Sequence, residues 1–357
     1  MDYNRIFKKI THNESVYYSE VGNKIFRQKR IEFLLFFLVF LFVNLFASFF
    51  IKRKKRTGRL GISWNPLHLK KIKAVVPLIN ILDISNNNLL SFSNNLTPGG
   101  FNLINVIRQA FRLKNYTKSS FNYSSFIYKI YIIILLDALK SHTENLEEVF
   151  VSGHFDRLTT IISEVCLVND IKLNVIQHGC IQNFDKKLIK NRIHGNIYYS
   201  YDFSKPFFKV FLDYDDSVSF IKINISQKYK FFTFVPSSKK IITFGCQDAV
   251  PSNNFEIIDF LIVNFKNYLI HIIPHPREKV NLYKRKYALN DNVNISYKKP
   301  SNTILFISRF STLGIEYQKA GVRTIFINLD KVKMDFIIES KHEVYTNLHD
   351  FENKFKE

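Results

Sequence analysis

The stretch VFVSGHFDRLTTIISEVCLVNDIKLNVIQHG, residues 149–179, decides the fold class of this chain. An apolar run at 149–152 precedes a segment of helical period at about 156–169, and a second apolar run follows at 172–177. Short apolar runs separated by one helix predict two parallel strands joined by a crossover helix. The second run ends at Gln177, His178 and Gly179, at the edge where open α/β sheets bind their ligands.

The same alternation returns in the last third of the chain. The predicted elements there are a strand at 239–245, a helix at about 254–267, a strand at 268–273, a strand at 303–307, a helix that begins at Ser311, and a strand at 323–328. Two such blocks predict an α/β protein with two domains that face a cleft. Residues 57–65 are predicted to form a linker that leads into the first block.

The predicted organisation has four parts. They are an N-terminal tail with a membrane helix (1–57), an N-terminal α/β domain (58–190), an irregular connection (191–234) and a C-terminal α/β domain (235–357). The membrane helix is predicted from FLLFFLVFLFVNLFASFFI, residues 33–51, whose 19 residues would rise about 28 Å as a helix. Basic residues on both flanks leave an in-plane or re-entrant helix open beside a true span.

The composition and charge of the chain limit the kinds of partner that it is expected to bind. The 357 residues carry a formal charge of +21, which predicts an anionic partner such as nucleic acid, an acidic lipid surface or a phosphorylated substrate. The sequence has no RNP signature, zinc-finger spacing or basic helix-turn-helix pattern, so nucleic acid is not predicted. Three cysteines without CxxC spacing, Cys166, Cys180 and Cys246, indicate a reducing compartment.

Two turns in the C-terminal block have residues suited to phosphate. Ser311 and Thr312 stand where a strand passes into a helix, whose free N–H groups and dipole attract an anion. Glu316 follows one turn later and is placed to accept hydrogen bonds from ribose hydroxyls, although a plain capped helix has the same pattern. His275 and Arg277, in IHIIPHPRE (270–278), follow another strand, and the planar guanidinium fits a phosphate group.

The candidates for acid–base chemistry lie in the first block. His178 is placed to deprotonate an acceptor hydroxyl or to donate to a phosphate oxygen, and His154 at the end of the neighbouring strand is the other candidate. Gln177 and Gly179 flank His178 at the acceptor side, where glycine permits close approach of a ligand. The acidic run at 213–216 matches a loose Asp-x-Asp metal pattern, but a solvated acidic loop is the better interpretation, and no metal is predicted.

The order of these turns resembles GT-B-fold glycosyltransferases of bacterial surface polysaccharides, of the capsule and O-antigen type. The likeness covers about residues 145–330 and rests on the three turns together with the Ala-Gly-Val turn at 320–322. It implies two Rossmann-like domains, with the acceptor side at 58–190 and the nucleotide donor held mainly by 235–357. By position, it implies that Arg277, Ser311 and Thr312 contact donor phosphates, that Glu316 contacts the ribose, and that His178 lies in the cleft at the acceptor side. It also implies a nucleotide sugar as substrate, a lipid-linked glycan as acceptor, and neither metal nor cofactor.

The resulting expectation is a transferase at the inner membrane, with its catalytic part in the cytoplasm and an anionic membrane surface as a partner. Three alternatives stay open: a polyol-phosphate transferase with a CDP-linked donor, an inactive membrane-tethered assembly protein, and a lumenal transferase of inverted topology. The absence of an Asp before Ser311 counts against the polyol-phosphate donor.

Overall fold

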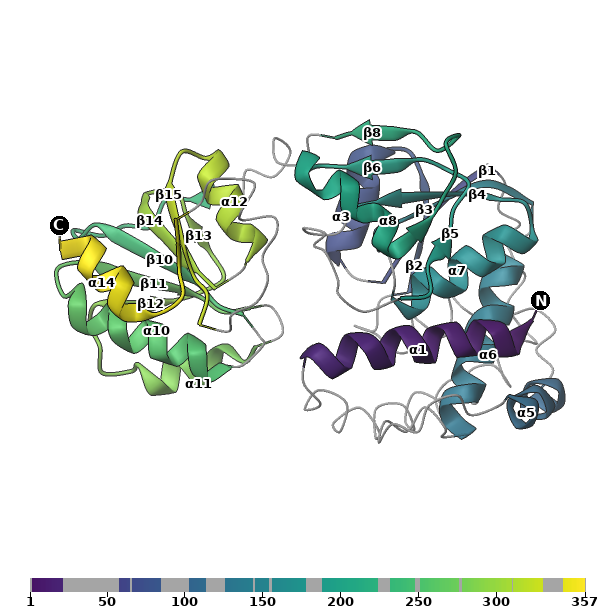
Figure 1. The fold of residues 1–357 in the computed structure, drawn as a ribbon, viewed down its shortest axis with the longest axis horizontal. Coiled ribbons are helices and arrows are strands. Elements are labelled where there is room, and N and C mark those ends of the chain that lie inside the picture. Colours follow the sequence, from purple (N-terminus) through teal and green to yellow (C-terminus); the bar gives the residue numbers. More distant parts are fainter. Residues whose placement is uncertain are drawn as a thin grey trace. The chain divides into compact units, whose positions relative to one another are not determined.

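The chain folds into two compact units, Met1–Ile225 and Ser226–Glu357, in a computed structural model (Figure 1). The structure describes residues 2–21, 58–64, 66–84, 103–113, 126–143, 145–153, 156–177, 188–223, 232–247, 251–275, 278–309, 311–329 and 343–356. Five predicted features lie outside these residues: the apolar stretch 33–51, His154, His178, Gly179 and Arg277. Among the described helices, none is long and apolar enough to cross a bilayer.

The first unit is built on a parallel sheet of six strands. In sheet order these are β2 (Asn80–Asp83), β1 (Gly58–Ser63), β3 (Leu146–Val151), β4 (Lys172–Ile176), β6 (Ile197–Tyr199) and β8 (Phe220–Lys222). Every neighbouring pair is parallel. All six carboxyl ends therefore meet at one edge of the sheet, which is the edge that the sequence predicts for the ligand.

Helices cover both faces of this sheet. They are α1 (Tyr3–Val21), α3 (Pro66–Val75), α5 (Leu103–Arg112), α6 (Phe126–Thr143) and α7 (Arg157–Val168). Successive strand residues point to opposite faces. Accordingly Phe150 and Ile176 pack with Ile72 of α3, whereas Val149 and Val151 pack in the cluster that contains α6 and α7. The short elements β5 (Asn191–Arg192), η2 (Asp202–Phe207), α8 (Phe208–Phe211) and β7 (Leu212–Asp213) complete the unit.

Two segments differ from the sequence-based expectation. The linker predicted at 57–65 is wrong, because Gly58–Ser63 forms β1, a strand between β2 and β3. Its two glycines and Arg59 dilute the apolar pattern that identifies a buried strand. Residues 191–223, within the expected irregular connection, supply β6 and β8. Each has only three residues, too few for a periodic pattern. They are strands because β6 pairs with β4 and β8 pairs with β6.

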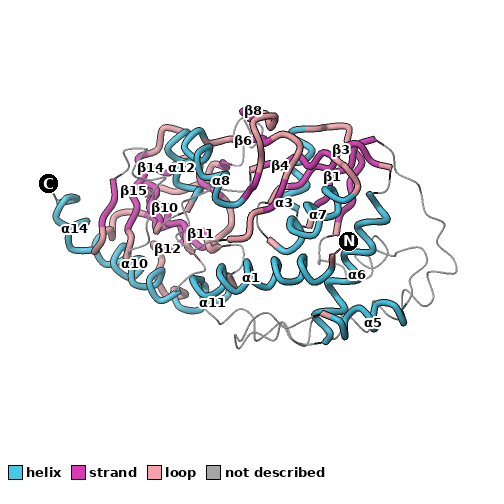
Figure 2. The backbone as a smooth tube through the Cα atoms, turned by 45° about the vertical axis from the view of Figure 1, so that its right-hand side comes forward, coloured by secondary structure: helices cyan, strands magenta, loops and turns pink. Residues whose placement is uncertain are grey.

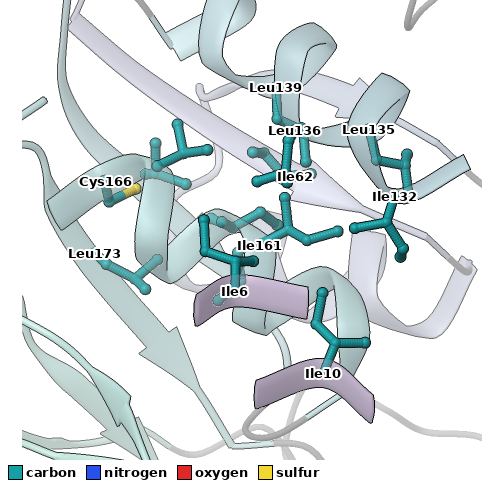
Figure 3. Packing of buried hydrophobic residues seen from close by; sticks show 14 of the residues in the cluster. Ile6, Ile10, Ile62, Ile132, Leu135, Leu136, Leu139, Ile161, Cys166 and Leu173 are labelled. Atoms are coloured by element: carbon teal, nitrogen blue, oxygen red, sulfur yellow. The ribbon is translucent and has the colours of Figure 1, made fainter. Parts of the chain in front are cut away.

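Helix α1 is part of the first unit's core (Figure 3). Ile6, Phe7 and Ile10 are at most 1% exposed, and burying each stabilises the unit by roughly 1.5–3 kcal/mol. The side chain of Glu164 on α7 is 6% exposed and pairs with Arg5 and with the Nζ of Lys9, at 3.0 Å. Removing both cations would leave a buried carboxylate unpaired, at a cost of about 3–5 kcal/mol. The first 21 residues are therefore a structural component of the unit.

The second unit has its own parallel sheet of six strands (Figure 2). In sheet order these are β12 (Val293–Ile295), β11 (Leu269–Ile273), β10 (Ile241–Gly245), β14 (Thr303–Ser308), β15 (Arg323–Ile327) and β16 (Glu343–Tyr345). The helices are α10 (Pro251–Asn264), α11 (Val280–Lys286), α12 (Thr312–Lys319) and α14 (Leu348–Lys356). A small ladder joins β9 (Phe232–Thr233) to β13 (Lys299–Pro300).

Both faces of the second sheet are covered as well. Phe244 and Ile272 pack in one cluster with residues of α10, α11 and α14. Phe306 packs in another cluster with Tyr317 of α12, their rings stacked with centroids 4.4 Å apart. The predicted fold class, α/β with two Rossmann-like domains, is confirmed in its architecture by these two parallel sheets.

Two buried tyrosines predict a loss of stability in alkali. The hydroxyl of Tyr283 donates to Glu278 at 2.6 Å, and that of Tyr287 donates to Asp259 at 2.8 Å. Burial, reinforced by these carboxylates, raises the pKa of both tyrosines. The unfolded chain releases these protons near pH 10, so the stability they confer is full below about pH 10 and falls above it.

We therefore expect the free energy of unfolding, measured with urea, to fall as the pH rises from about 10 to about 12. Tyr287→Phe should show a shallower fall, because one of the groups that titrates differently in the two states is gone. A free energy of unfolding that stays constant or rises over this range would contradict the assignment.

Candidate functional site

Three neighbouring strands of the second unit end level with one another. Gly245 at the end of β10 is paired with Ile273 of β11 on one side and with Ser308 of β14 on the other. His275 follows β11 by two residues, and Ser311 follows β14 by three. Parallel pairing in this register places both residues at the carboxyl edge of the sheet, as the sequence predicts.

Ser311 is the N-cap of α12. Its Oγ accepts a hydrogen bond from the N–H of Leu313 at 3.2 Å, and its own N–H donates to the Oγ of Ser308 at 3.2 Å. Thr312 is the first residue of the helix. The helix therefore has a capped, electropositive N-terminus at the sheet edge, which suits an anion. The sequence left two roles open for Ser311, a helix cap and a ligand contact, and the structure shows the cap.

Glu316 lies one turn into α12. One carboxylate oxygen accepts from the Nζ of Lys299 at 2.6 Å, and the side chain is 37% exposed. Lys299 belongs to β13, so the ion pair ties α12 to the crossing from β12 to β14. An ionised carboxylate offers about four acceptor positions, so an ion pair with one lysine leaves capacity for ribose hydroxyls. The predicted ribose role of Glu316 stays a prediction.

A carboxylate holds the turn that follows β11. The N–H of His275 donates to one oxygen of Glu278 at 2.8 Å, and the N–H of Glu278 donates back to the carbonyl of His275 at 2.8 Å. The second oxygen of Glu278 accepts from Tyr283 and, at 3.1 Å, from the Nδ2 of Asn254 on α10. Glu278, the residue after the predicted phosphate ligand Arg277 in the sequence, is thereby held by His275, Tyr283 and Asn254.

Arg309 lies behind this edge and is fully buried. One guanidinium nitrogen donates to the Oδ1 of Asn254 at 3.1 Å, so Asn254 bridges Arg309 and Glu278. Burial raises the pKa of the Cys246 thiol, with Glu278 raising it further and Arg309 opposing it, which places both charges near this thiol. The sequence reasoning missed this network, and a charged residue directly after an apolar strand was the only signal for Arg309.

At the edge of the first sheet, Gln177 has a structural role. It is 1% exposed, and its Oε1 accepts from the N–H of Ser200 at 2.7 Å and of Tyr201 at 3.2 Å. Its carbonyl accepts from the Nζ of Lys71 on α3 at 3.1 Å. Gln177 thus joins the end of β4 to the chain after β6, directly before the predicted His178 and Gly179.

Asp156, beside the predicted His154, caps helix α7. Its carboxylate accepts from the N–H groups of Leu158 and Thr159, each at 3.1 Å. Burial raises the pKa of this carboxyl, and the hydrogen bonds from Thr159 oppose the shift. A carboxylate that satisfies the first N–H groups of a helix is explained by folding alone.

The acidic run at 213–216 is engaged by an arginine. Arg192 donates to Asp213 at 3.0 Å and to Asp215 at 3.1 Å. Over the part of the chain that the structure describes, no group of three or more His, Cys, Asp or Glu side chains is arranged to hold a metal ion.

Comparison with known proteins supports the fold. No protein-family model matches the chain, and no curated protein is similar to it in sequence. Among solved structures it is similar to MnaA of S. aureus in complex with UDP, with a TM-score of 0.52 and 11% identity over 84% of this chain and 87% of that one. The UDP-GlcNAc 2-epimerase from Methanocaldococcus jannaschii has a TM-score of 0.51 and 13% identity over 85% and 92%.

The UDP-GlcNAc 2-epimerase from Neisseria meningitidis bound to UDP-GlcNAc is similar to the same degree, with a TM-score of 0.50 and 12% identity over 84% of this chain and 90% of that one. Structural similarity at this level of sequence identity establishes the fold alone. The chain has a GT-B-like fold of two Rossmann-like domains, which it shares with these UDP-GlcNAc 2-epimerases.

Proposed function

We propose that this protein binds a nucleotide sugar at the carboxyl edge of its second sheet and transfers the sugar to a lipid-linked or growing glycan at a membrane. The observation that carries the proposal is the level ending of β10, β11 and β14, with the N-terminus of α12 opening at the same edge. An electropositive helix end and Arg277 suit a diphosphate, and Glu316 suits a ribose. Similar folds hold UDP and UDP-GlcNAc in their own structures.

The proposed chemistry is a displacement at the anomeric carbon. The acceptor oxygen forms a bond to this carbon and gives its proton to a base, for which His178 and His154 are the candidates. The bond from the anomeric carbon to the diphosphate oxygen breaks, and its electron pair goes to the departing nucleotide. Fixed donors aimed at this growing charge stabilise the transition state by about 3 kcal/mol each.

Epimerisation of a nucleotide sugar is the second candidate, because the similar structures above include UDP-GlcNAc 2-epimerases. Incubation of the protein with a UDP-sugar alone and then with a lipid-linked acceptor separates the two. A transferase releases UDP only when the acceptor is present, whereas an epimerase produces a new UDP-sugar isomer without it. CDP-glycerol as donor tests the polyol-phosphate alternative in the same assay.

Substitutions at Ser311 test the anion site directly. Ser, Asn and Asp cap helices about equally well. The free energies of unfolding of Ser311→Asp and Ser311→Asn should therefore each lie within about 0.5 kcal/mol of the wild-type value. The aspartate adds a negative charge where the diphosphate is expected. We therefore expect UDP or another nucleoside diphosphate to raise the melting temperature of the wild type and of Ser311→Asn, but not of Ser311→Asp.

The screen uses UDP, CDP, GDP and CMP derivatives, because a ligand at 100 times its Kd stabilises the folded state by about 2.7 kcal/mol. Equal shifts in the Asp and Asn variants would place the nucleotide elsewhere. No shift with any nucleotide in the wild type would favour the inactive assembly protein.

A further inference from the structure

The first unit has an open pocket of about 580 Å³, lined by residues of α1, α7, β7 and the chain at 189–192 that includes β5. Helix α7 begins near the carboxyl edge of the sheet, where Asp156 caps it, and runs back along the sheet toward β4. Leu167, which lines the pocket, lies eleven residues after this cap, roughly 16 Å along the helix. The pocket is therefore separate from the strand ends at which the catalytic residues are predicted.

Positive charge dominates the lining of this pocket. Its charged residues are five cations, Arg5, Lys8, Lys9, Lys190 and Arg192, and two carboxylates, Glu164 and Asp213. The lining thus has an excess of three positive charges, or of two when Asp215, which also receives Arg192, is counted with it. Cations held close together repel one another, and an anion bound between them relieves this repulsion. The electrostatics of the pocket therefore favour an anionic ligand.

Three of the cations are held in place by carboxylates. Lys9 is 5% exposed, and its Nζ donates to one oxygen of Glu164 at 3.0 Å. Arg5 pairs with the other oxygen of the same carboxylate. Arg192 donates to Asp213 at 3.0 Å. A ligand that binds here loses little free energy in ordering these side chains, because the fold has already positioned them.

Two exposed lysines and two apolar side chains complete the lining. Lys8 and Lys190 are 182 positions apart in the sequence, yet both line the pocket. Leu167 and Ile189 line it too, and are 36% and 38% exposed. Ammonium and guanidinium groups bind phosphate oxygens by charge-assisted hydrogen bonds, and exposed apolar side chains favour an apolar substituent. A phosphate-bearing ligand matches both parts of the lining.

We propose that the pocket between α1 and α7 binds a small phosphate-bearing anion, as a second anion site in addition to the donor site of the second unit. The phosphate contacts Arg5, Lys8 and Lys190, and an apolar part of the ligand lies on Leu167 and Ile189. Free phosphate or diphosphate and the headgroup of an anionic lipid share this chemistry. The site is independent of the proposed sugar transfer.

Isothermal titration calorimetry of the full chain with sodium diphosphate tests the site. All proteins carry Ser311→Asp, which removes the anion site predicted at α12. We expect saturable binding that Lys8→Glu and Lys190→Glu each weaken at least about tenfold, because each change replaces a charge-assisted contact with a repulsion. Lys73→Glu is the matched control. Lys73 is exposed on α3, which packs on the other face of the sheet, so the affinity should stay within about twofold.

Dihexanoylphosphatidylglycerol below its micelle concentration distinguishes the two sources of the phosphate. A lipid headgroup as the natural ligand predicts that this lipid displaces diphosphate, and that Leu167→Ser weakens the binding of the lipid but not that of diphosphate. Binding of diphosphate without displacement by the lipid identifies a free phosphate compound instead. The proposal is overturned if neither compound binds saturably to the Ser311→Asp protein. It is also overturned if Lys73→Glu weakens binding as much as Lys190→Glu, since net charge alone then accounts for the attraction.

Discussion

Replacing Glu316 by alanine should reduce turnover about 100- to 1,000-fold while the protein stays folded, and Arg277→Ala should do the same. Both side chains are proposed to grip one activated donor, Arg277 at the diphosphate and Glu316 at the ribose. Charge builds on the diphosphate as the glycosidic bond breaks, so the loss of Arg277 should act chiefly on kcat. The ribose is held before and during the reaction, so the loss of Glu316 should raise KM, and the misplaced donor should lower kcat as well.

Matched exposed residues provide the controls. Glu256 on α10 and Arg285 on α11 are exposed members of the same unit, and alanine at either position should leave turnover within about a factor of two of the wild type. Glu316→Ala also frees Lys299 from its ion pair, so Lys299→Ala is needed beside it. Near-normal turnover in both Arg277→Ala and Glu316→Ala, with folding shown by circular dichroism, would remove the basis of the proposed donor site.

Replacing Arg309 by methionine should lower the free energy of unfolding by about 1.5–3 kcal/mol. Arg309 is fully buried and donates to Asn254, which in turn donates to Glu278. Methionine keeps most of the volume but removes the guanidinium, so the carbonyl of Asn254 loses a donor and nearby Glu278 loses a compensating charge. A loss of this size is a large share of the 5–15 kcal/mol that typically stabilises a domain.

Urea denaturation of the wild type and the variants measures this effect. Arg285→Met removes an exposed guanidinium from α11 of the same unit and should change the free energy of unfolding by no more than about 0.5 kcal/mol. Arg309→Lys, which keeps the charge but not the planar fork, should fall between the two. Equal stability of Arg309→Met and Arg285→Met would show that the buried network contributes little.

The strands and helices that the sequence predicts best are those with a local signal. The runs at 149–152 and 172–177 appear as β3 and β4, and the segment between them as α7. The strands that precede His275 and Ser311 appear as β11 and β14, in a register that brings these two residues to one edge. Parallel strands with helical crossovers allow little else, so the ends of the strands indicate the position of the site.

The roles of single side chains at that edge were less predictable. Ser311 is found at a helix N-terminus, but its hydroxyl is used as a cap. Glu316 is found one turn later, but it is paired with Lys299, which is 17 positions away in sequence. His178, His154 and Arg277 stay predictions. A hydrogen-bond partner from another element has no periodic signal, so pattern reasoning cannot identify it.

The sequence by itself determined the class of the fold, two blocks of strand and helix alternation, and the turns at which ligand chemistry concentrates. These features depend on periodicity and on the residues next to each strand, which are local properties of a chain. Only the tertiary structure decided that Gly58–Ser63 is an inner strand, that Arg309 is buried, and that α1 belongs to the core of the first unit. The reason is physical: burial and charge pairing depend on residues that are distant in sequence and meet only when the chain is folded.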